Sequence, residues 1–399
     1  MSKGVREVGG RAPAIAVCGV DFGWGSAGKL RAVLRACRAL RDDLRVVVLG
    51  TRLGRPVLAD QAVEAWYEHW PRERRTLGAL LDRHGVAAGL VVLDPAAAEA
   101  LEEAGCRTVF LDSLPYLWTA ADALPFNVTA YCAQYCPQLP RPSWDPLRRV
   151  ARLHWVEGVM TGPPAGPRDR SLAVLNLGGL HSPANPDGNP TYLSLVLAPA
   201  LAALARAGYR TVHACGNISA VDIPETARVP AVTIQVGPRP HAEFLALLAR
   251  AGLLLTSPGL TTLLEASSQA TPTVCLPPQN LSQILNGDRF ATIVDAGCRV
   301  SWPVGVLDLG AVEQARVHGE EAGLAEIDRV LRSHDPAAVH PRLLELVEAA
   351  ILRAGQVRSW SALADDTGRG GAHQVAQVLL GIVAEPVAAE RRERQDAAS

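Results

Sequence analysis

The 399-residue sequence has no excess of either charge, and it contains very few lysines. It carries 39 Lys and Arg against 40 Asp and Glu, a formal net charge of −1, and its two lysines are Lys3 and Lys29. A protein that binds a polyanion by charge needs a basic excess, so nucleic acid is not an expected partner.

The eight cysteines lack the spacing of a metal site. Cys132 and Cys136 are separated by three residues, and neither a second cysteine pair nor a His-x-His follows, so no zinc site is predicted. Cys18, Cys215 and Cys275 lie in apolar runs, where cysteine acts as a small buried hydrophobe. This usage predicts a reducing compartment, the cytoplasm.

The sequence also lacks a segment that would span a membrane. Its first apolar run, residues 14–20, has seven residues, too few for a membrane span, and no signal-peptide cleavage site follows. Residues 1–12 are polar and Gly-rich and are expected to form a flexible tail. The hydrophobic content of 48% predicts a folded chain, and the length suggests two domains.

Short apolar runs alternate along the chain with longer runs of helical periodicity. Before a Pro/Gly-rich break at 160–170, strands are predicted at 14–20, 44–50, 89–94 and 107–112, and helices at 26–43, 62–70, 74–84 and 96–104. After it, strands are predicted at 171–179, 211–216, 232–237, 253–257 and 273–277, and helices at 191–207, 241–250 and 260–269. Apolar strands joined by helices indicate α/β units with parallel sheets. The chain is mostly helical from about residue 311, and a loop at 365–371 precedes a final helix.

The glycine-rich loop at 23–30, GWGSAGKL, follows the first strand and admits three interpretations. A G-x-G-x-x-G dinucleotide site needs an acidic residue near the end of the second strand, where this chain has LGTR at 49–52. A Walker A loop needs Ser or Thr after Lys29, where Leu30 stands. In the third interpretation, free N–H groups at the helix start attract an anion at the floor of a cleft. Asp21 precedes the loop, either as a catalytic base or as a residue that organises the turn.

A second segment, residues 253–265, is the most informative part of the sequence. An apolar strand ends in a Ser-Pro-Gly turn, and the next helix starts with Thr261 and Thr262, whose N–H and hydroxyl groups suit a diphosphate. Glu265 lies one turn further, where a carboxylate suits ribose hydroxyls. Amides follow at 279–286, and amides both donate to and accept from sugar hydroxyls.

These motifs resemble the donor site of nucleotide-sugar glycosyltransferases of the GT-B type. They are similar to the members that add N-acetylglucosamine to the lipid-linked peptidoglycan precursor, whose Q-Q-x-x-N motif corresponds to SQILN at 282–286. The loop NLGG at 176–179 resembles the glycine loop that opens the second domain, and VGPR at 236–239 stands at the end of the base-binding strand.

The resemblance implies an α/β fold with two Rossmann-like domains that face each other across a cleft. The expected divisions are a tail at 1–12, an acceptor domain at 13–165, a donor domain at 166–371, and a C-terminal helix with a frayed tail at 372–399. That helix is expected to return to the first domain.

A narrower resemblance rests on CGVDFGWGSAGKL at 18–30 and LDSLPYLW at 111–118. Both segments resemble the cytosylglucuronate and hydroxymethylcytosylglucuronate synthases of peptidyl-nucleoside antibiotic biosynthesis. The resemblance implies inverting transfer of glucuronate from UDP-glucuronate to N1 of cytosine or hydroxymethylcytosine, with no metal and no cofactor besides the UDP-sugar co-substrate. Another UDP-sugar glycosyltransferase of natural-product or cell-wall-precursor synthesis, a nucleotide-sugar epimerase and a non-catalytic sensor stay open, and the oligomeric state is not predicted.

The resemblance also implies roles for individual residues. The family usually has His where Ser26 or Ala27 stands, so Asp21 is expected to be the base, with Asp112 second. The acceptor-binding residues are expected to be Trp24, Gly25, Ser26, Tyr116 and Trp118. The donor-binding residues, with Lys29 and Arg239 as candidate partners of a donor carboxylate, are Lys29, Gly178, Gly179, Gly237, Arg239, Ser257, Gly259, Thr261, Thr262, Glu265, Gln279, Asn280 and Gln283.

Overall fold

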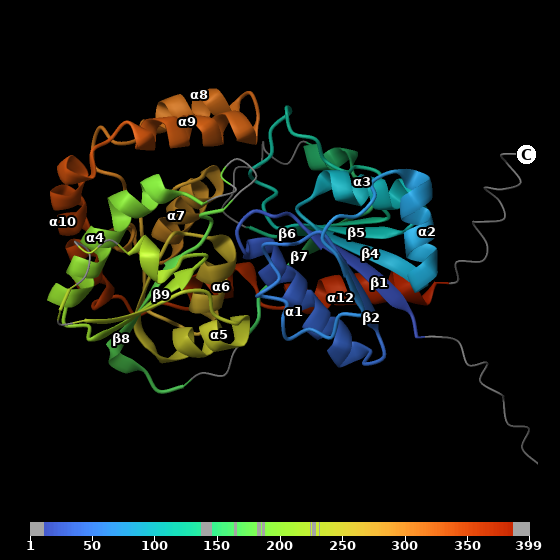
Figure 1. The fold of residues 1–399 in the computed structure, drawn as a ribbon, viewed down its shortest axis with the longest axis horizontal. Helices are drawn as coiled ribbons and strands as arrows, with labels where there is room; N and C mark the ends of the chain where they lie inside the picture. Colours follow the sequence, from blue (N-terminus) through green and yellow to red (C-terminus); the bar gives the residue numbers. More distant parts are fainter. Residues whose placement is uncertain are drawn as a thin grey trace, which may run out of the picture.

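The computed structural model describes residues 12–136, 146–162, 166–181, 185, 188–223, 225, 229–230 and 232–385. In this part the chain folds into two lobes, each built on a parallel sheet (Figure 1). The predicted tail lies outside the described residues except for residue 12, and the frayed end predicted after the last helix lies outside them beyond residue 385.

The first domain holds a seven-stranded sheet in the order β3-β2-β1-β4-β5-β6-β7. Its strands are β1 (Ala14–Gly19), β2 (Arg45–Leu49), β3 (Ala65–Tyr67), β4 (Val86–Val92), β5 (Thr108–Asp112), β6 (Ala130–Gln134) and β7 (Leu153–Val156). Its helices are α1 (Gly25–Leu40), α2 (Arg74–His84) and α3 (Pro95–Glu103). All six residues of β1 are buried, as its unbroken apolar sequence requires in a sheet covered on both faces.

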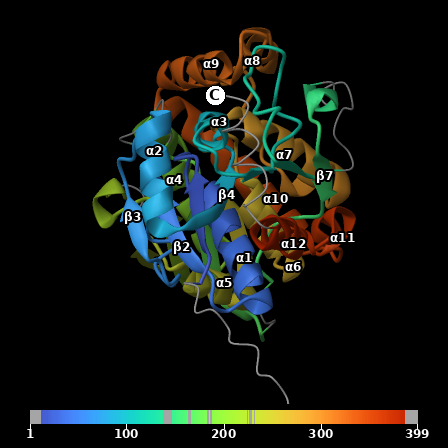
Figure 2. The same cartoon turned by 90° about the vertical axis from the view of Figure 1, so that its right-hand side faces the viewer.

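The C-terminal helix α12 (Gly371–Ala384) returns to this first domain, as expected. It packs against α1 and β4, and Figure 2 shows it beside α1. Its apolar side packs into the core that contains Ile15 and Leu30, through Val375, Ala376 and Leu379. The two helices α2 and α3 cover the opposite face.

The second domain holds a five-stranded sheet in the order β10-β9-β8-β11-β12. Its strands are β8 (Asp169–Leu177), β9 (Thr211–Gly216), β10 (Thr233–Val236), β11 (Ala251–Thr256) and β12 (Thr273–Cys275). Its helices are α4 (Pro190–Arg206), α5 (His241–Arg250), α6 (Leu260–Ser268), α7 (Leu281–Ile293), α8 (Leu309–Arg316), α9 (Glu320–Arg332), α10 (Pro336–Ala354) and α11 (Ala362–Thr367). Two α/β units facing each other are therefore confirmed.

The helix predicted at 62–70 is wrong, because residues 65–67 form strand β3. Ala65 pairs with Val47 and Tyr67 with Leu49 in a parallel ladder. Aromatic side chains such as Trp66 and Tyr67 favour strands, and here that preference prevails over helical spacing. Strands β6 and β7 were not predicted, and the loop predicted at 365–371 begins inside α11.

Two further observations concern the cysteines and the helices. All eight cysteines are buried, and none of them forms a disulfide within the described residues. None of the helices within the described residues has the length and apolar character needed to cross a bilayer.

Candidate functional site

A cleft of ≈ 220 Å³ lies between the two domains and is lined by residues of both. Most of the predicted site residues line it: Trp24, Gly25, Ser26, Lys29, Trp118, Gly178, Gly179, Arg239, Gly259, Thr261, Thr262, Glu265, Asn280 and Gln283. The predicted site residues outside this lining are Asp21, Asp112, Tyr116, Gly237, Ser257 and Gln279.

The two predicted glycine loops face each other across this cleft. The N–H of Gly23 donates to the carbonyl of His181 at 2.8 Å. Gly23 has a φ of +56°, and a Cβ atom there would lie 3.2 Å from the backbone of Gly179. Position 23 therefore requires glycine for both its conformation and its close approach to the other domain.

The N-terminal turns of two helices meet at the same place. Helix α1 starts after β1 and helix α6 starts after β11, each at the carboxyl end of a central strand. Thr261 in the first turn of α6 lies against α1, because a Cβ at Gly28 would be 3.3 Å from its methyl group. Two helix N-termini directed into one cleft give it a positive potential.

Lys29 adds a positive charge to this part of the cleft. Its side chain is 2% exposed, and its Nζ donates to Thr261 Oγ1 at 2.5 Å. Burial lowers the pKa of Lys29 to about 8, although the negative charge of Glu265 acts in the opposite direction. Within the described part of the chain no carboxylate forms an ion pair with this ammonium, so it retains donors for an anion.

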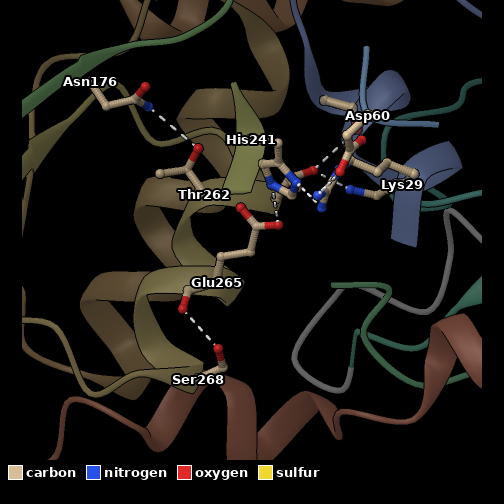
Figure 3. Close-up of polar contacts among 10 residues, drawn as sticks. Lys29, Asp60, Asn176, His241, Thr262, Glu265 and Ser268 are labelled. Carbon is tan, nitrogen blue, oxygen red and sulfur yellow. Dashed lines mark hydrogen bonds and ion pairs between the residues drawn. The ribbon is translucent and has the colours of Figure 1, made fainter. Parts of the chain in front are cut away.

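Glu265 is held by a chain of hydrogen bonds that crosses from one domain to the other (Figure 3). Its Oε1 lies 2.9 Å from His241 Nε2, and His241 Nδ1 lies 2.9 Å from the guanidinium of Arg31. Arg31, in α1, is 1% exposed and also donates through Nε to Asp60 at 3.0 Å. Since arginine only donates, His241 Nδ1 must accept, and the imidazole proton lies on Nε2 and is donated to Glu265. A neutral His241 thus orients the Glu265 carboxylate.

The predicted sugar-binding amides contact protein groups. Gln279 Nε2 and Gln283 Nε2 each donate to the carbonyl of Gly178 at 3.0 Å. Gln283 Oε1 accepts from the N–H of Gln279, and Asn280 Oδ1 caps α7. These amides therefore fix the glycine loop at 178–179, and Gln279 lies behind it.

Asp21, the predicted base, lies on a neighbouring loop. Its carboxylate accepts from the backbone N–H of Leu53 at 3.0 Å and of Arg52 at 3.3 Å. Leu53 lines the cleft and Asp21 does not. This placement corresponds to the turn-organising role weighed above.

Asp112, the second predicted base, is fully buried under the cleft. It accepts from Trp118 Nε1 at 2.8 Å, from Tyr131 Oη at 2.7 Å and from the N–H of Leu114 at 2.9 Å. Burial raises the pKa of Asp112 to about 6, against the opposing effect of these three hydrogen bonds. Its geometry is that of a residue that positions Trp118, which lines the cleft.

The remaining predicted residues outside the cleft lining support its walls. Tyr116 Oη donates to Asn286 Oδ1. The N–H of Ser257 donates to the carbonyl of Asn176 at 3.0 Å, and the N–H of Gly237 donates to that of Ala214 at 3.1 Å.

Arg239 lines the end of the cleft beside β10. Its guanidinium donates to Gln235 Oε1 at 3.2 Å, while its Nε is buried without a partner. An unpaired buried donor is destabilising until a ligand accepts from it.

The sequence interpretation assigned no role to four residues that line the cleft, Ser113, His241, Asn286 and Glu320, or to Arg31, which contacts His241 from outside the lining. Asn286 had a signal, since it ends the SQILN motif. Ser113 also had one, since it lies in the LDSLPYLW segment at 111–118. Arg31, His241 and Glu320 had none, because their roles depend on contacts between segments far apart in sequence. No group of three or more His, Cys, Asp or Glu side chains suited to a metal ion occurs within the described ranges.

Comparison with known proteins identifies the fold. No protein-family profile matches the chain, and curated protein sequences give no significant match. MurG of Acinetobacter baumannii aligns with a TM-score of 0.52 at 12% identity, over 92% of this chain and 99% of that one. UGT2 of Phytolacca americana, complexed with UDP-2fluoro-glucose and pterostilbene, aligns with a TM-score of 0.51 at 13% identity, over 94% and 100%. UGT89C1 of Arabidopsis thaliana, complexed with UDP, aligns with a TM-score of 0.52 at 14% identity, over 94% and 100%. These neighbours are GT-B glycosyltransferases, and this chain shares their fold.

Proposed function

We propose that the chain is a glycosyltransferase that transfers a sugar from a UDP-sugar to a small acceptor. The observation that carries this proposal is the convergence of two helix N-termini and the buried Lys29 in one cleft, with Glu265 held beside them. Positive groups of this kind suit a diphosphate, and a carboxylate held in place suits the paired hydroxyls of a ribose.

The donor is placed along the second-domain wall in this proposal. The diphosphate lies at the start of α6, within reach of Lys29 and the hydroxyls of Thr261 and Thr262. The ribose hydroxyls donate to Glu265. The pyrimidine lies toward Arg239, whose unpartnered Nε can donate to a base carbonyl.

The reaction is a direct displacement at the anomeric carbon with inversion. The acceptor forms a bond to that carbon, the bond to the diphosphate oxygen breaks, and UDP leaves with the electron pair. Helix N–H groups and Lys29 stabilise the leaving group, so the proposal includes no metal. Turnover in excess EDTA should therefore equal turnover in buffer.

The finer proposal is UDP-glucuronate as donor and cytosine or hydroxymethylcytosine as acceptor. The residues at 18–30 and 111–118 that resemble cytosylglucuronate synthases include cleft residues of the first domain, among them Trp24 and Trp118. Indole rings give a flat base a surface to stack on. Of the two cations expected to meet a glucuronate carboxylate, Lys29 lies beside the diphosphate and is the one within reach, whereas Arg239 is assigned to the pyrimidine.

The first test is a thermal-shift and calorimetry series with UDP, UDP-glucose, UDP-N-acetylglucosamine and UDP-glucuronate. A ligand present at 100 times its Kd and bound only to the folded state adds about 2.7 kcal/mol of stability, so a shift should be visible. ATP with Mg²⁺ and NADPH are the controls, since the chain lacks the hydroxyl and the carboxylate those sites require. A shift with either control and none with any UDP compound would overturn the proposal.

The second test is product analysis with and without cytosine. Transfer requires the acceptor and yields a β-linked product from an α-linked donor. Conversion of donor alone would identify an epimerase, and binding without turnover on any acceptor would identify a sensor.

A further inference from the structure

One corner of the cleft lies where the second domain touches the segment after β5. The hairpin of α8 and α9 reaches this segment, which rises to meet it in Figure 1. Arg316, at the end of α8, donates to the carbonyls of Tyr116 at 3.2 Å and Leu117 at 2.8 Å. The N–H of Glu320, the first residue of α9, donates to Asp122 Oδ1 at 3.3 Å. These bonds fix Glu320 against the first domain.

Glu320 brings an unengaged carboxylate into the cleft. The cleft lining contains two acidic side chains, Glu265 and Glu320, and Glu265 is bonded to His241. Glu320 accepts no hydrogen bond from the residues that the structure describes. Partial burial and the carboxylates of Asp122 and Glu321 raise the pKa of Glu320 to about 7, against the opposing charge of Arg316.

Two buried polar atoms without partners line the same cleft. Ser113, directly after β5, is 1% exposed, and its Oγ has no hydrogen-bond partner. Asn286 is 3% exposed, and its Oδ1 accepts from Tyr116 while its Nδ2 has no partner. Tyr116 thereby links Asn286 of the second domain to the first-domain segment that contains Ser113. Arg316 contacts the same segment. Ser113, Asn286 and Glu320 all line the cleft.

A buried donor without a partner costs about 1–3 kcal/mol. Such groups in a cleft indicate a ligand that satisfies them. The cost would be relieved by a ligand that accepts from the Asn286 amide and the Ser113 hydroxyl. Leu93, Leu114 and Trp118 of the first domain also line the cleft, with apolar side chains.

We propose that this corner is the acceptor subsite and that Glu320 is the general base of the transfer, an inference that rests on the proposed function. The acceptor is a flat, uncharged molecule with a carbonyl oxygen for the Asn286 amide and an N–H or O–H that faces Glu320. Its heteroatom bonds to the anomeric carbon as the bond to UDP breaks, and its proton passes to a carboxylate oxygen of Glu320. UDP leaves with the electron pair, so charge and protons balance.

The assignment predicts a rise in kcat/KM with pH. Glu320 must be ionised to accept a proton, so activity increases as the pH rises through about 7. The charged groups that face Glu320 are Asp122 of the first domain, Arg316 of α8 and Glu321 of α9. Of these, Asp122 and Glu321 raise the pH midpoint of the rise in activity, and Arg316 lowers it.

The test compares Glu320→Gln with a matched control, Glu321→Gln, an exposed neighbour on the same helix. We expect Glu320→Gln to lower kcat by ~10²–10⁴-fold, to abolish the pH-dependent rise and to leave UDP affinity within about twofold. Glu321→Gln should retain wild-type kcat at pH values well above 7 and should move the midpoint of the rise to lower pH, because the charge of Glu321 raises the pKa of Glu320. Asn286→Asp keeps the acceptor for Tyr116 but replaces the free donor, so the acceptor KM should rise about tenfold or more.

Two outcomes separate this inference from the function it rests on. If the wild-type protein binds no UDP-sugar, the proposed function fails and the assignment fails with it. If donor binds and turns over, but Glu320→Gln retains turnover within about threefold and keeps the rise near pH 7, the base assignment alone is overturned. Melting temperatures of both variants show that each is folded.

Discussion

The two walls of the cleft differ in the polarity of their side chains. The second domain contributes mainly polar side chains, which hold one another in place: Asn176, Arg239, His241, Thr261, Thr262, Glu265, Asn280, Gln283 and Asn286. The first domain contributes mainly glycines and apolar side chains: Val20, Phe22, Trp24, Leu53, Val57, Leu93, Leu114 and Trp118. A polar wall suits a charged nucleotide, and an apolar wall suits a flat acceptor that it cannot bind by charge.

Lys29 is the exception to this contrast, and its replacement should have the largest effect among variants at Lys29, Glu265, Arg31 and Asp21. Lys29→Met should lower kcat/KM by roughly 10–100-fold, since a hydrogen bond to a charged group is worth ~1.5–3 kcal/mol. The melting temperature should stay the same or rise, because the variant removes a buried charge. A variant that loses activity and stability together would instead show a structural role for Lys29.

The same lysine makes a prediction about stability and pH. Its folded pKa of about 8 lies below the ordinary value of 10.5, so the unfolded chain binds more protons between these values. Wild-type stability should therefore gain a contribution as pH rises from about 8 toward 10.5. Denaturant titrations across this range should show that gain, and Lys29→Met should lack it.

Glu265 tests the polar wall. Glu265→Ala should weaken UDP binding about tenfold or more, because the ribose hydroxyls lose a charged acceptor. Glu243→Ala, at an exposed position on α5, is the matched control and should bind UDP normally. Calorimetry with UDP measures both, and equal affinities would remove Glu265 from the donor site.

A variant of Arg31 tests whether the first domain influences UDP binding through His241 and Glu265. Arg31→Met removes the donor to His241 and should weaken UDP binding by about threefold to tenfold, less than the loss of Glu265 itself. If Arg31 acts through His241 on Glu265, the double variant Arg31→Met/Glu265→Ala should bind UDP no more weakly than Glu265→Ala alone. Additive losses in this double-mutant cycle would show that Arg31 affects donor binding by another route.

Asp21→Asn should have the smallest effect. Its carboxylate supports the backbone at 52–53, and Asn retains one of the two acceptor oxygens, so kcat should fall by less than about threefold. A hundredfold loss of kcat at unchanged melting temperature would instead identify Asp21 as the base and exclude Glu320.

Parts of the cleft that are formed by one continuous segment could be predicted from the sequence. The segment 253–265 combines a strand, a turn and a helix start with residues that line the cleft, so its local pattern predicted both its fold and its place at the cleft. The same holds for the loop at 23–30, whose placement opposite 178–179 is seen in the structure. Strand β3 escaped prediction because its three residues are defined by pairing with β2.

The parts of the site that escaped prediction are those that depend on tertiary contacts. Nothing local marks Arg31 as the partner of His241, which is 210 residues away along the chain. Glu320 looks like an ordinary acidic helix start until the segment after β5 packs against it. The amides at 279 and 283 were recognised by type, but their bonds to Gly178 could only be seen in the fold.

The bond between Arg31 and His241 has a consequence for engineering. Proteins built from two domains invite chimeras, in which one domain is exchanged for another. In this protein the first domain supplies the arginine that fixes the imidazole tautomer beside Glu265, so a transplanted second domain would lack the support for His241 and Glu265. A working chimera would have to carry Arg31 and Asp60 along with the second domain, so the exchangeable unit is larger than the second domain alone.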